Sequence, residues 1–300
     1  MSSALPVALP ARDPSGHKGT FGSVCVVAGN AAPPTVMLGS AALVALGALR
    51  AGASLCQVAA PQPLLPFVLE AVTSATGIAL PVDEHGHLMP SGVAACLDMA
   101  AARAHVLAVG PGLGTSFAAQ QVVIRLVSHE TVRPVVLDAD ALNCLALTPQ
   151  FLQDFRARAV VTPHPAEYAR LARALSLPED AVTPAVREAA AERLAQRMAA
   201  VVVLKGHRTV VSDGARTWTC SHGNDVLAVG GSGDVLTGVV AGLLAQWHSS
   251  LGLFECACLA VQAHALAGER WAARTGGTAG MLAQELAAEV PAVLPLLRGA

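Results

Sequence analysis

Residues 224–238 read NDVLAVGGSGDVLTG and lead directly into an apolar segment. Three glycines, Gly230, Gly231 and Gly233, lie on either side of one serine, and Asp234 follows them. A tight turn needs only one or two glycines, because glycine is required mainly where φ is positive or where another group comes very close. The density of glycine in this stretch therefore predicts that a ligand approaches the backbone.

The segment 235–247 is predicted to be a helix. Free N–H groups at a helix start, with no side chains in front of them, form an anion site suited to phosphate. A carboxylate beside a phosphate would repel it, so we expect Asp234 to act as a general base on the hydroxyl that attacks the phosphate. The alternative is a flexible turn in which Asp234 caps the helix.

The overall composition narrows the class of protein. The chain has 300 residues, of which 53% are hydrophobic and 13% charged. This length is near the limit of about 250–300 residues for one hydrophobic core, so a single domain over residues 1–300 is expected. The net charge of −2 and the single tyrosine give no basis for nucleic-acid binding. The low charged fraction favours a homo-oligomer.

Membrane, leader and disulfide signals are weak. The apolar stretches 36–49 and 235–247 are shorter than the ~18–20 residues of a membrane span. The segment 1–14 has no basic leader and is interrupted by prolines, so no secretory signal is expected. The seven cysteines include no CxxC motif and fit reduced thiols rather than disulfides or zinc. We therefore expect a cytoplasmic protein without a membrane partner.

Short β-branched runs alternate with longer runs rich in alanine and leucine. Strands are predicted at 23–29, 55–59, 105–109, 135–137, 159–161 and 201–204. Continuous apolar strands that alternate with helices predict an α/β fold with a central, mostly parallel sheet and helices on both faces. A hairpin and three helices are expected to follow, at 209–211 with 217–220 and at 232–248, 254–273 and 281–290.

Four polar or glycine-rich segments each follow a predicted strand. They read GPGLGTS (110–116), DADALN (138–143), TPHPAE (162–167) and KGHRT (205–209). In open parallel sheets, ligands bind beyond the carboxyl ends of the strands. We therefore expect the four segments to meet at one rim of the sheet and to form the functional site.

Two nucleotide-binding motifs are missing. GPGLG does not match the dinucleotide fingerprint GxGxxG, which disfavours a Rossmann dehydrogenase. The pattern GxxxxGK[ST] does not occur, so the chain is not a P-loop enzyme. Lys205 could contact a nucleotide phosphate or simply be solvated.

Other single residues are ambiguous. His164 stands between two prolines, where a lone histidine is more often a hydrogen-bonded loop residue than a catalyst. Glu167 could hold magnesium through water or belong to the first turn of the next helix. Asp138 and Asp140 could bind a ligand or cap the helix that begins after them.

Eight segments in one order resemble the NAD(P)H-hydrate dehydratase family of the ribokinase-like superfamily. They are HKGTFGSVCVVAG, GSAALVALGALRAGAS, VGPGLGTS, VVLDADALN, VVTPHPAEYARL, VVLKGHRTVV, NDVLAVGGSGDVLTGVVAGLLAQ and HALAGERWAARTGGTAGMLAQELAAEVPAVL. The resemblance covers about residues 17–294 and implies a ribokinase-like fold. Each motif alone is moderately specific, whereas eight in this order are highly specific.

The resemblance also implies a reaction. Members of this family are magnesium-using hydro-lyases that repair the hydrated cofactor NADHX or NADPHX, acting on its S-epimer. ADP in bacterial members, or ATP in eukaryotic ones, phosphorylates the added hydroxyl, and loss of phosphate restores the nicotinamide double bond. The composition, rich in alanine and with more arginine than lysine, favours a bacterial source and ADP. A homotetramer and a separate epimerase, with no N-terminal epimerase domain here, are further implications.

The same resemblance assigns residues to roles. Asp234 would be the base, and the transferred phosphoryl group would be stabilised by Gly231, Ser232 and Gly233. The nucleotide would contact Lys205, Gly206, His207, Arg208, Thr209 and Gly233. The hydrated substrate would contact Ser40, Gly112, Gly114, His164 and Asp234. Glu167 would organise magnesium through water.

The sequence departs from the family pattern in a few places. Ser40 and Ser232 replace the usual Ala and Thr, which are mild changes, and AGN at 28–30 followed by AAPP replaces the usual GGS loop. Two other functions compete. One is a kinase for a hydroxymethyl or hydroxyethyl vitamin precursor, which would release a stable phosphorylated product. The other is a non-catalytic nucleotide-binding protein, which the presence of Asp234 argues against.

Overall fold

The computed structural model describes residues 4–128 and 133–298. Within that part of the chain, nine strands form one sheet in the order β3-β2-β1-β4-β5-β6-β7-β8-β9. Strands β1 to β7 are parallel, and β8 and β9 complete the sheet as an antiparallel hairpin. The bounds are β1 (Ser23–Val27), β2 (Leu55–Pro61), β3 (Thr76–Leu80), β4 (Val106–Val109), β5 (Pro134–Leu137), β6 (Arg158–Val161), β7 (Val201–Leu204), β8 (Val210–Ser212) and β9 (Thr217–Thr219).

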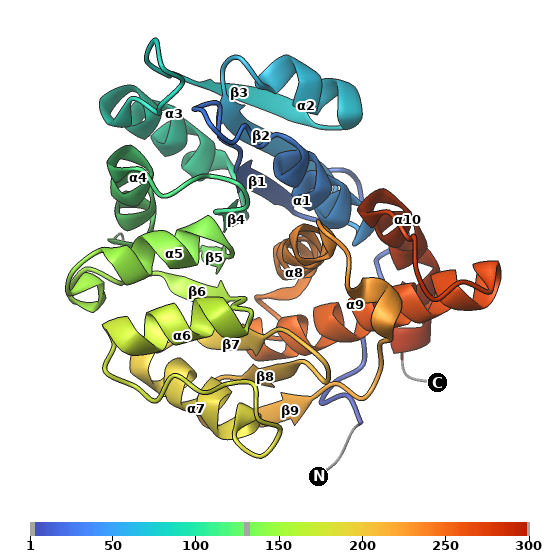
Figure 1. Ribbon diagram of the computed structural model, residues 1–300. Coiled ribbons are helices and arrows are strands. Elements are labelled where there is room, and N and C mark those ends of the chain that lie inside the picture. The colour runs from blue at the N-terminus through green and yellow to red at the C-terminus, as the bar shows by residue number, and fades with distance from the viewer. Residues whose placement is uncertain (1–3, 129–132, 299–300) are drawn as a thin grey trace.

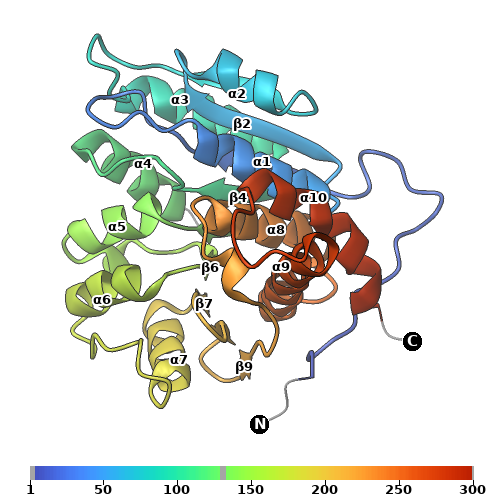
Figure 2. The ribbon, with the colours of Figure 1, turned by 45° about the vertical axis from the view of Figure 1, so that its right-hand side comes forward.

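Helices cover both faces of the sheet, as Figures 1 and 2 show. One face carries α1 (Gly39–Arg50), α2 (Leu65–Ala71), α8 (Ser232–Trp247), α9 (Leu253–Thr275) and α10 (Ala283–Val293). The other carries α3 (Pro90–Arg103), α4 (Phe117–Ser128), α5 (Asp140–Leu147), α6 (Pro165–Ala174) and α7 (Arg187–Met198). The predicted α/β fold, with a mostly parallel sheet between two helical layers, is confirmed.

Each central strand supplies both hydrophobic cores. In β1, Val24 and Val26 belong to the core under α1 and α8, whereas Cys25 and Val27 belong to the core on the opposite face. Side chains of a strand alternate between the two faces, so a strand buried on both sides must be apolar at every position. This is why the central strands were recognisable as continuous apolar runs.

The sequence analysis missed one strand and misplaced several ends. Edge strand β3 reads TGIAL, and only its last residue is fully buried, so it lacks the apolar run of the central strands. The predicted strand 23–29 ends at Val27, and the predicted helix 281–290 occupies 283–293 instead. Shifts of this size arise where the chain leaves an element gradually.

Two further sequence expectations concern cysteines and membranes. All seven cysteines lie in the described part of the chain, and none forms a disulfide. Burial raises the pKa of the Cys25 thiol to about 12, so this thiol stays protonated and unreactive. In the ranges 4–128 and 133–298, no helix has the length and apolar character needed to cross a membrane.

Helices α1 and α8 touch backbone to backbone. A Cβ added at Gly238 of α8 would overlap the carbonyl oxygen of Val44, and one added at Gly47 of α1 would lie 2.5 Å from the carbonyl oxygen of Val235. Glycine is therefore required at both positions. Because the helices run in the same direction, their N-termini lie together at the carboxyl edge of the sheet, where Ser40 of α1 bonds to α8.

This contact predicts that Gly238→Ala destabilises the fold by about 1–3 kcal/mol, because the added methyl group forces two backbones apart. Chemical denaturation would measure the change. Gly39→Ala in α1 is the control, since a Cβ there meets nothing within 4 Å. Its stability should stay within about 1 kcal/mol of the parent. Equal losses in the two variants would contradict the close approach.

Candidate active site

The four polar segments meet at one rim of the sheet. Lys205, which follows β7, lies 2.5 Å from Asp138, which follows β5, and 3.7 Å from Glu167 of α6, which follows β6. The backbone N–H of Gly114, after β4, donates to Asp140 at 2.9 Å. The predicted convergence of the segments after β4, β5, β6 and β7 is therefore confirmed.

The glycines at the start of α8 serve different purposes. Gly231 has φ +87°, and a Cβ there would lie 2.5 Å from Leu43, so backbone geometry and packing both require glycine. A Cβ at Gly230 would meet nothing within 4 Å, and one at Gly233 would meet only the Lys205 ammonium at 3.4 Å. The open space expected for an anion thus lies before Gly230 and Gly233, whereas Gly231 is constrained by its neighbours.

Asp234 lies in the first turn of α8, and among the described residues no side chain caps that helix. The alternative interpretation of Asp234 as a cap is therefore wrong. Its carboxylate instead accepts a hydrogen bond from Ser40 of α1. Burial, reinforced by the negative charge of Asp138, raises the pKa of Asp234 to about 6, although Ser40 and Lys205 oppose the shift. Such a carboxylate is largely ionised at neutral pH and is well matched to accept a proton.

Lys205 is held in a buried ion pair. Its ammonium lies 2.5 Å from Asp138, whose side chain is 1% exposed and also accepts from the Thr237 hydroxyl at 2.7 Å. Burial disfavours the ammonium, but the charges of Asp138 and Glu167 outweigh it and raise the pKa of Lys205. The alternative of a solvated lysine is wrong, since the side chain is only 17% exposed. A fixed positive charge therefore lies beside Gly233.

His164 and Glu167 form a reciprocal cap at the start of α6. The His164 Nδ1 accepts from the backbone N–H of Ala166 at 3.1 Å, and Glu167 accepts from the backbone N–H of His164 at 2.7 Å. Burial and the nearby Lys205 lower the pKa of His164, while burial raises that of Glu167 to about 7. The expectation that Glu167 belongs to the first turn of a helix is confirmed.

The protein offers few ligands for a metal ion. In the part of the chain that the structure describes, no group of three or more His, Cys, Asp or Glu side chains could hold one. Both Glu167 oxygens already face donors, namely the backbone N–H and the ring of His164. These residues do not fit a site built from protein ligands alone. Magnesium commonly binds through substrate phosphates and retains several waters, and a water-mediated role for Glu167 stays a prediction.

Two of the residues predicted for the substrate, Ser40 and Gly112, lie near Asp234. A Cβ on Gly112 would come within 3.2 Å of the Ser40 hydroxyl, and Ser40 in turn bonds to Asp234. Gly114 has φ +77° and is fixed by Asp140. The structure therefore brings Ser40 and Gly112 together with Asp234, whereas Gly114 lies against Asp140 and Asn30.

The unusual loop at 28–34 reaches the same region. The Asn30 side chain donates to the carbonyls of Ala32 and Thr35 at 3.1 and 3.0 Å, so it stabilises its own loop. A Cβ on Gly114 would lie 3.6 Å from this asparagine. The loop thus forms one wall beside the glycine segment that follows β4.

The predicted nucleotide-binding segment leaves β7 and reaches the surface. Gly206, His207 and Arg208 are exposed, and Thr209 is partly buried. Its base is fixed by Arg187 of α7, which sequence reasoning missed. The buried guanidinium donates to the carbonyls of Leu204 and Lys205 at 3.0 and 3.2 Å. An arginine at a helix start resembles an ordinary surface residue in sequence, so no sequence signal identified it.

His264 of α9 is a second residue that sequence reasoning missed. Its Nε2 lies 3.0 Å from the Ser232 carbonyl oxygen and 3.1 Å from the Ser232 hydroxyl. Burial lowers the pKa of His264 to about 4, so the ring is neutral. A carbonyl can only accept, so Nε2 carries the proton and donates. The Ser232 hydroxyl oxygen shares this one N–H with the carbonyl, so the hydroxyl can direct its own proton to a ligand.

Lys205→Met should destabilise the protein by about 3 kcal/mol, the lower end of the range for breaking a buried ion pair, because Asp138 would stay buried without its partner. Chemical denaturation would measure the loss. Adding Asp138→Asn should recover part of it. The control is Arg125→Met, which breaks an exposed ion pair with Asp98 and should cost less than about 1 kcal/mol. A loss in Lys205→Met no larger than in the control would contradict the buried pairing.

The fold and site define the chain as a ribokinase-like α/β protein. A ribokinase-like superfamily protein from Enterococcus faecalis superposes with a TM-score of 0.77, at 23% identity, over 97% of this chain and 93% of the other. An ADP/ATP-dependent NAD(P)H-hydrate dehydratase from Bacillus subtilis, co-crystallised with ATP and Mg²⁺, also gives a TM-score of 0.77, at 28% identity, over 97% and 95%.

The chain belongs to the NAD(P)H-hydrate dehydratase family, whose sequence profile matches residues 24–292. An ADP-dependent (S)-NAD(P)H-hydrate dehydratase from Neisseria meningitidis is 36% identical over 94% of this chain and 88% of its own length. A bifunctional NAD(P)H-hydrate repair enzyme from Moorella thermoacetica is 37% identical over 95% of the chain, which spans about half (52%) of that relative. The family match supports the dehydratase interpretation and not the vitamin-precursor kinase.

Proposed function

We propose that this chain uses ADP, in preference to ATP, to dehydrate the S-epimer of NADHX or NADPHX to the reduced cofactor. The proposal follows family membership and the name of the Neisseria relative. On this proposal the chain is a lyase that repairs a damaged metabolite. The observation that supports it best is Asp234, a half-buried carboxylate with a pKa raised to about 6 at the open N-terminus of a helix.

Asp234 is proposed as the general base. Ser40 donates to the carboxylate and orients it, and Gly112 lies beside Ser40 without a side chain to block the substrate. A hydrate hydroxyl that lies between Asp234 and the phosphate would lose its proton to the carboxylate as its oxygen attacks phosphorus. A base that is ionised at neutral pH, yet has a raised pKa, accepts that proton most effectively.

The start of α8 is proposed as the anion hole for the transferred phosphoryl group. The backbone N–H of Ser232 donates to the Val229 carbonyl at 3.3 Å, so we assign the anion hole to the N–H groups of Gly231 and Gly233 and to the Ser232 hydroxyl. The Ser232 hydroxyl is proposed to direct its proton to the phosphate, because the Nε2–H of His264 is shared between the Ser232 carbonyl and hydroxyl oxygens. The Lys205 ammonium, next to Gly233, adds a fixed positive charge without an added cost of reorganisation.

The exposed loop Gly206–Thr209 is proposed to bind the rest of the nucleotide, with Arg187 as its anchor. With ADP, the bond between the terminal phosphorus and its bridging oxygen breaks, and AMP leaves with the electron pair. The phosphorylated hydrate then loses phosphate together with the C–O electron pair. Loss of a proton from the neighbouring carbon restores the ring double bond. His164 is proposed to contact the hydrated substrate from the start of α6.

Several finer features stay proposals. We propose that magnesium accompanies the nucleotide phosphates, with Glu167 acting through water, and that the enzyme works in the cytoplasm as a homotetramer.

A single domain over residues 1–300, working with a separate NAD(P)HX epimerase, is supported by the Neisseria relative, which is named for the dehydratase activity alone. Light scattering would measure the oligomeric state.

The reaction itself is tested by mixing the purified protein with magnesium and S-NADHX, with ADP in one sample and ATP in another. A rise in dihydronicotinamide absorbance that depends on the nucleotide supports the proposal, and the faster sample identifies the donor. A flat trace in both samples, from folded protein that still binds nucleotide, would favour a small-molecule kinase.

Asp234→Asn should leave the fold and nucleotide affinity nearly intact and lower turnover by about 10²–10⁴-fold, which is the usual contribution of a general base. The amide keeps the size of the side chain and can still bond to Ser40, but it cannot accept the proton. Steady-state kinetics and calorimetric nucleotide binding would measure the two effects. A thermal destabilisation large enough to account for the lost activity would argue against a catalytic role.

The rate should also depend on pH in a defined direction. Asp234 must be ionised to act, so kcat is expected to fall as pH drops below about 6, the pKa to which burial raises it. Ser40→Ala removes a hydrogen bond that favours the charged form, so the acidic limb should move to higher pH. Initial rates across a pH series would measure both curves. An unmoved limb in Ser40→Ala would show that another group titrates.

A further inference from the structure

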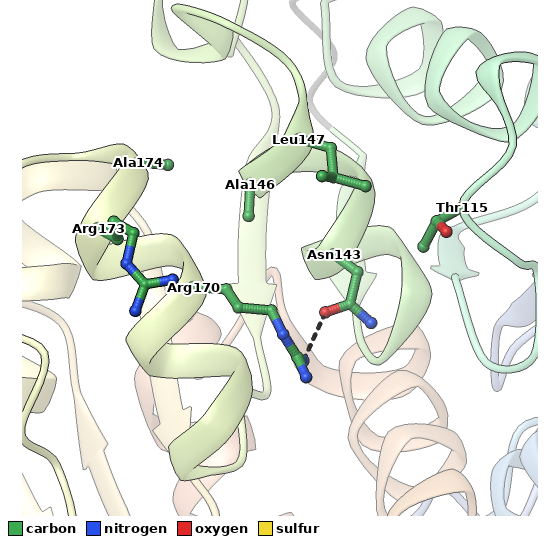
Figure 3. Close-up of a pocket in the computed structure, with 7 residues that line it drawn as sticks. All are labelled: Thr115, Asn143, Ala146, Leu147, Arg170, Arg173 and Ala174. Carbon is green, nitrogen blue, oxygen red and sulfur yellow. Dashed lines mark hydrogen bonds between the residues drawn. The ribbon is translucent and has the colours of Figure 1, made fainter.

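A hollow of about 510 Å³ lies on the outer surface between α5 and α6 (Figure 3). It is lined by Thr115, Asn143, Ala146, Leu147, Arg170, Arg173 and Ala174. Figure 3 shows Arg170 extending from α6 toward Asn143 of α5. None of the roles proposed above uses this hollow.

The two arginines of the hollow differ in their partners. Arg173 is bound by Glu179 through two hydrogen bonds, of 3.0 and 2.6 Å. Arg170 donates to the Asn143 side-chain oxygen at 2.9 Å, and among residues 4–128 and 133–298 no carboxylate lies within ion-pair distance of it. The charge of Arg170 also acts on Glu167, which lies beyond ion-pair distance. With one neutral hydrogen-bond partner, Arg170 retains most of its five donors for an anion.

A continuous network joins Arg170 to the proposed active site. Asn143 donates to Asp140 at 3.1 Å, and the other Asp140 oxygen accepts from Gly114. The negative charge of Asp140 also contributes to the raised pKa of Asp234. On the second side, the charge of Arg170 lowers the pKa of His164, so the guanidinium lies near that ring as well. The hollow therefore adjoins the substrate side of the site.

The remaining lining suits a nucleoside. Ala146, Leu147 and Ala174 are apolar, and with Leu147 57% exposed they present an apolar wall to the hollow. A dinucleotide bound with its nicotinamide end at Asp234 must extend away from the rim. A charged anchor at the near end of an apolar hollow fits a phosphate followed by its nucleoside.

We propose that Arg170 binds a phosphate of the dinucleotide substrate, and that the hollow between α5 and α6 receives the adenosine end. The inference rests on the proposed dehydration of NADHX or NADPHX. Two phosphate sources share this chemistry, the bridging pyrophosphate of both substrates and the 2′-phosphate found only in NADPHX. Arg170 is thus assigned to substrate affinity and not to the chemical step.

The test compares the parent protein with Arg170→Gln on three substrates, namely S-NADHX, S-NADPHX and the hydrated dihydronicotinamide riboside, which has no phosphate. Arg170→Gln should raise KM about 10- to 100-fold for the phosphate-bearing substrates, the range for one charged hydrogen bond, with little change in kcat. KM for the riboside and for ADP should not move. Arg125→Gln of α4, outside the hollow, controls for the lost charge.

The pattern of KM values identifies the phosphate. An increase for both dinucleotides supports binding of the pyrophosphate, and an increase for NADPHX alone supports binding of the 2′-phosphate. Unchanged KM values for both dinucleotides, or an equal increase for the riboside, would overturn the inference. Ala174→Asp provides a second variant, since it adds a negative charge at an exposed position of the hollow and leaves Arg170 in place. It should also raise KM for the dinucleotides only.

Failure of the inference can be separated from failure of the proposed function. Dehydration by the parent protein tests the function by itself. Binding of intact NADH and NADPH, followed by dihydronicotinamide fluorescence, tests the hollow without turnover. Weaker binding of either dinucleotide to Arg170→Gln than to Arg125→Gln supports the inference, and equal affinities would refute it.

Discussion

The close approach of α1 and α8 is the constraint on which the rest of the site depends. Gly47 and Gly238 let the two backbones touch, and no other residue fits at these positions without moving a helix. Since the helices run in the same direction, their N-termini emerge together at the carboxyl edge of the sheet. That arrangement brings the Ser40 hydroxyl to the Asp234 carboxylate, where it favours the ionised form. The packing of two apolar helices thus determines the position of the proposed base.

At the rim, charges of opposite sign lie close together, although they come from segments that follow different strands. Asp138 would raise the pKa of Asp234 further if its own charge were not opposed by Lys205 and its lone pairs engaged by Thr237. Burial disfavours the Lys205 ammonium, and the charges of Asp138 and Glu167 outweigh that effect. Each buried ionised group therefore requires the others, which is the condition under which buried charges persist. The result is one available base and one fixed positive charge on adjacent elements.

Much of this architecture could be predicted because it depends on local pattern. Continuous apolar runs identified the central strands, and the glycines before residue 235 identified the start of α8. The edge strand β3 escaped because only Leu80 is fully buried. His264 and Arg187 could not be found in sequence, since each acts across a long separation, on Ser232 and on the loop after β7. The local sequence pattern indicates whether a segment is a strand or a helix. The contacts of His264 and Arg187 join residues far apart in the sequence, so they exist only in the folded chain.

The distribution of positive charge suggests separate positions at one rim for the phosphates of the donor and of the substrate. Lys205 is largely buried beside the α8 N-terminus, where the phosphoryl group would be transferred, and Arg170 lines the hollow between α5 and α6. The carboxylates of Asp138 and Asp140 lie in the segment between them. A phosphate would be repelled from that segment and held on either side of it, so donor and substrate would each have one preferred position. Substrate orientation would then follow from charge placement before any contact with the reacting hydroxyl.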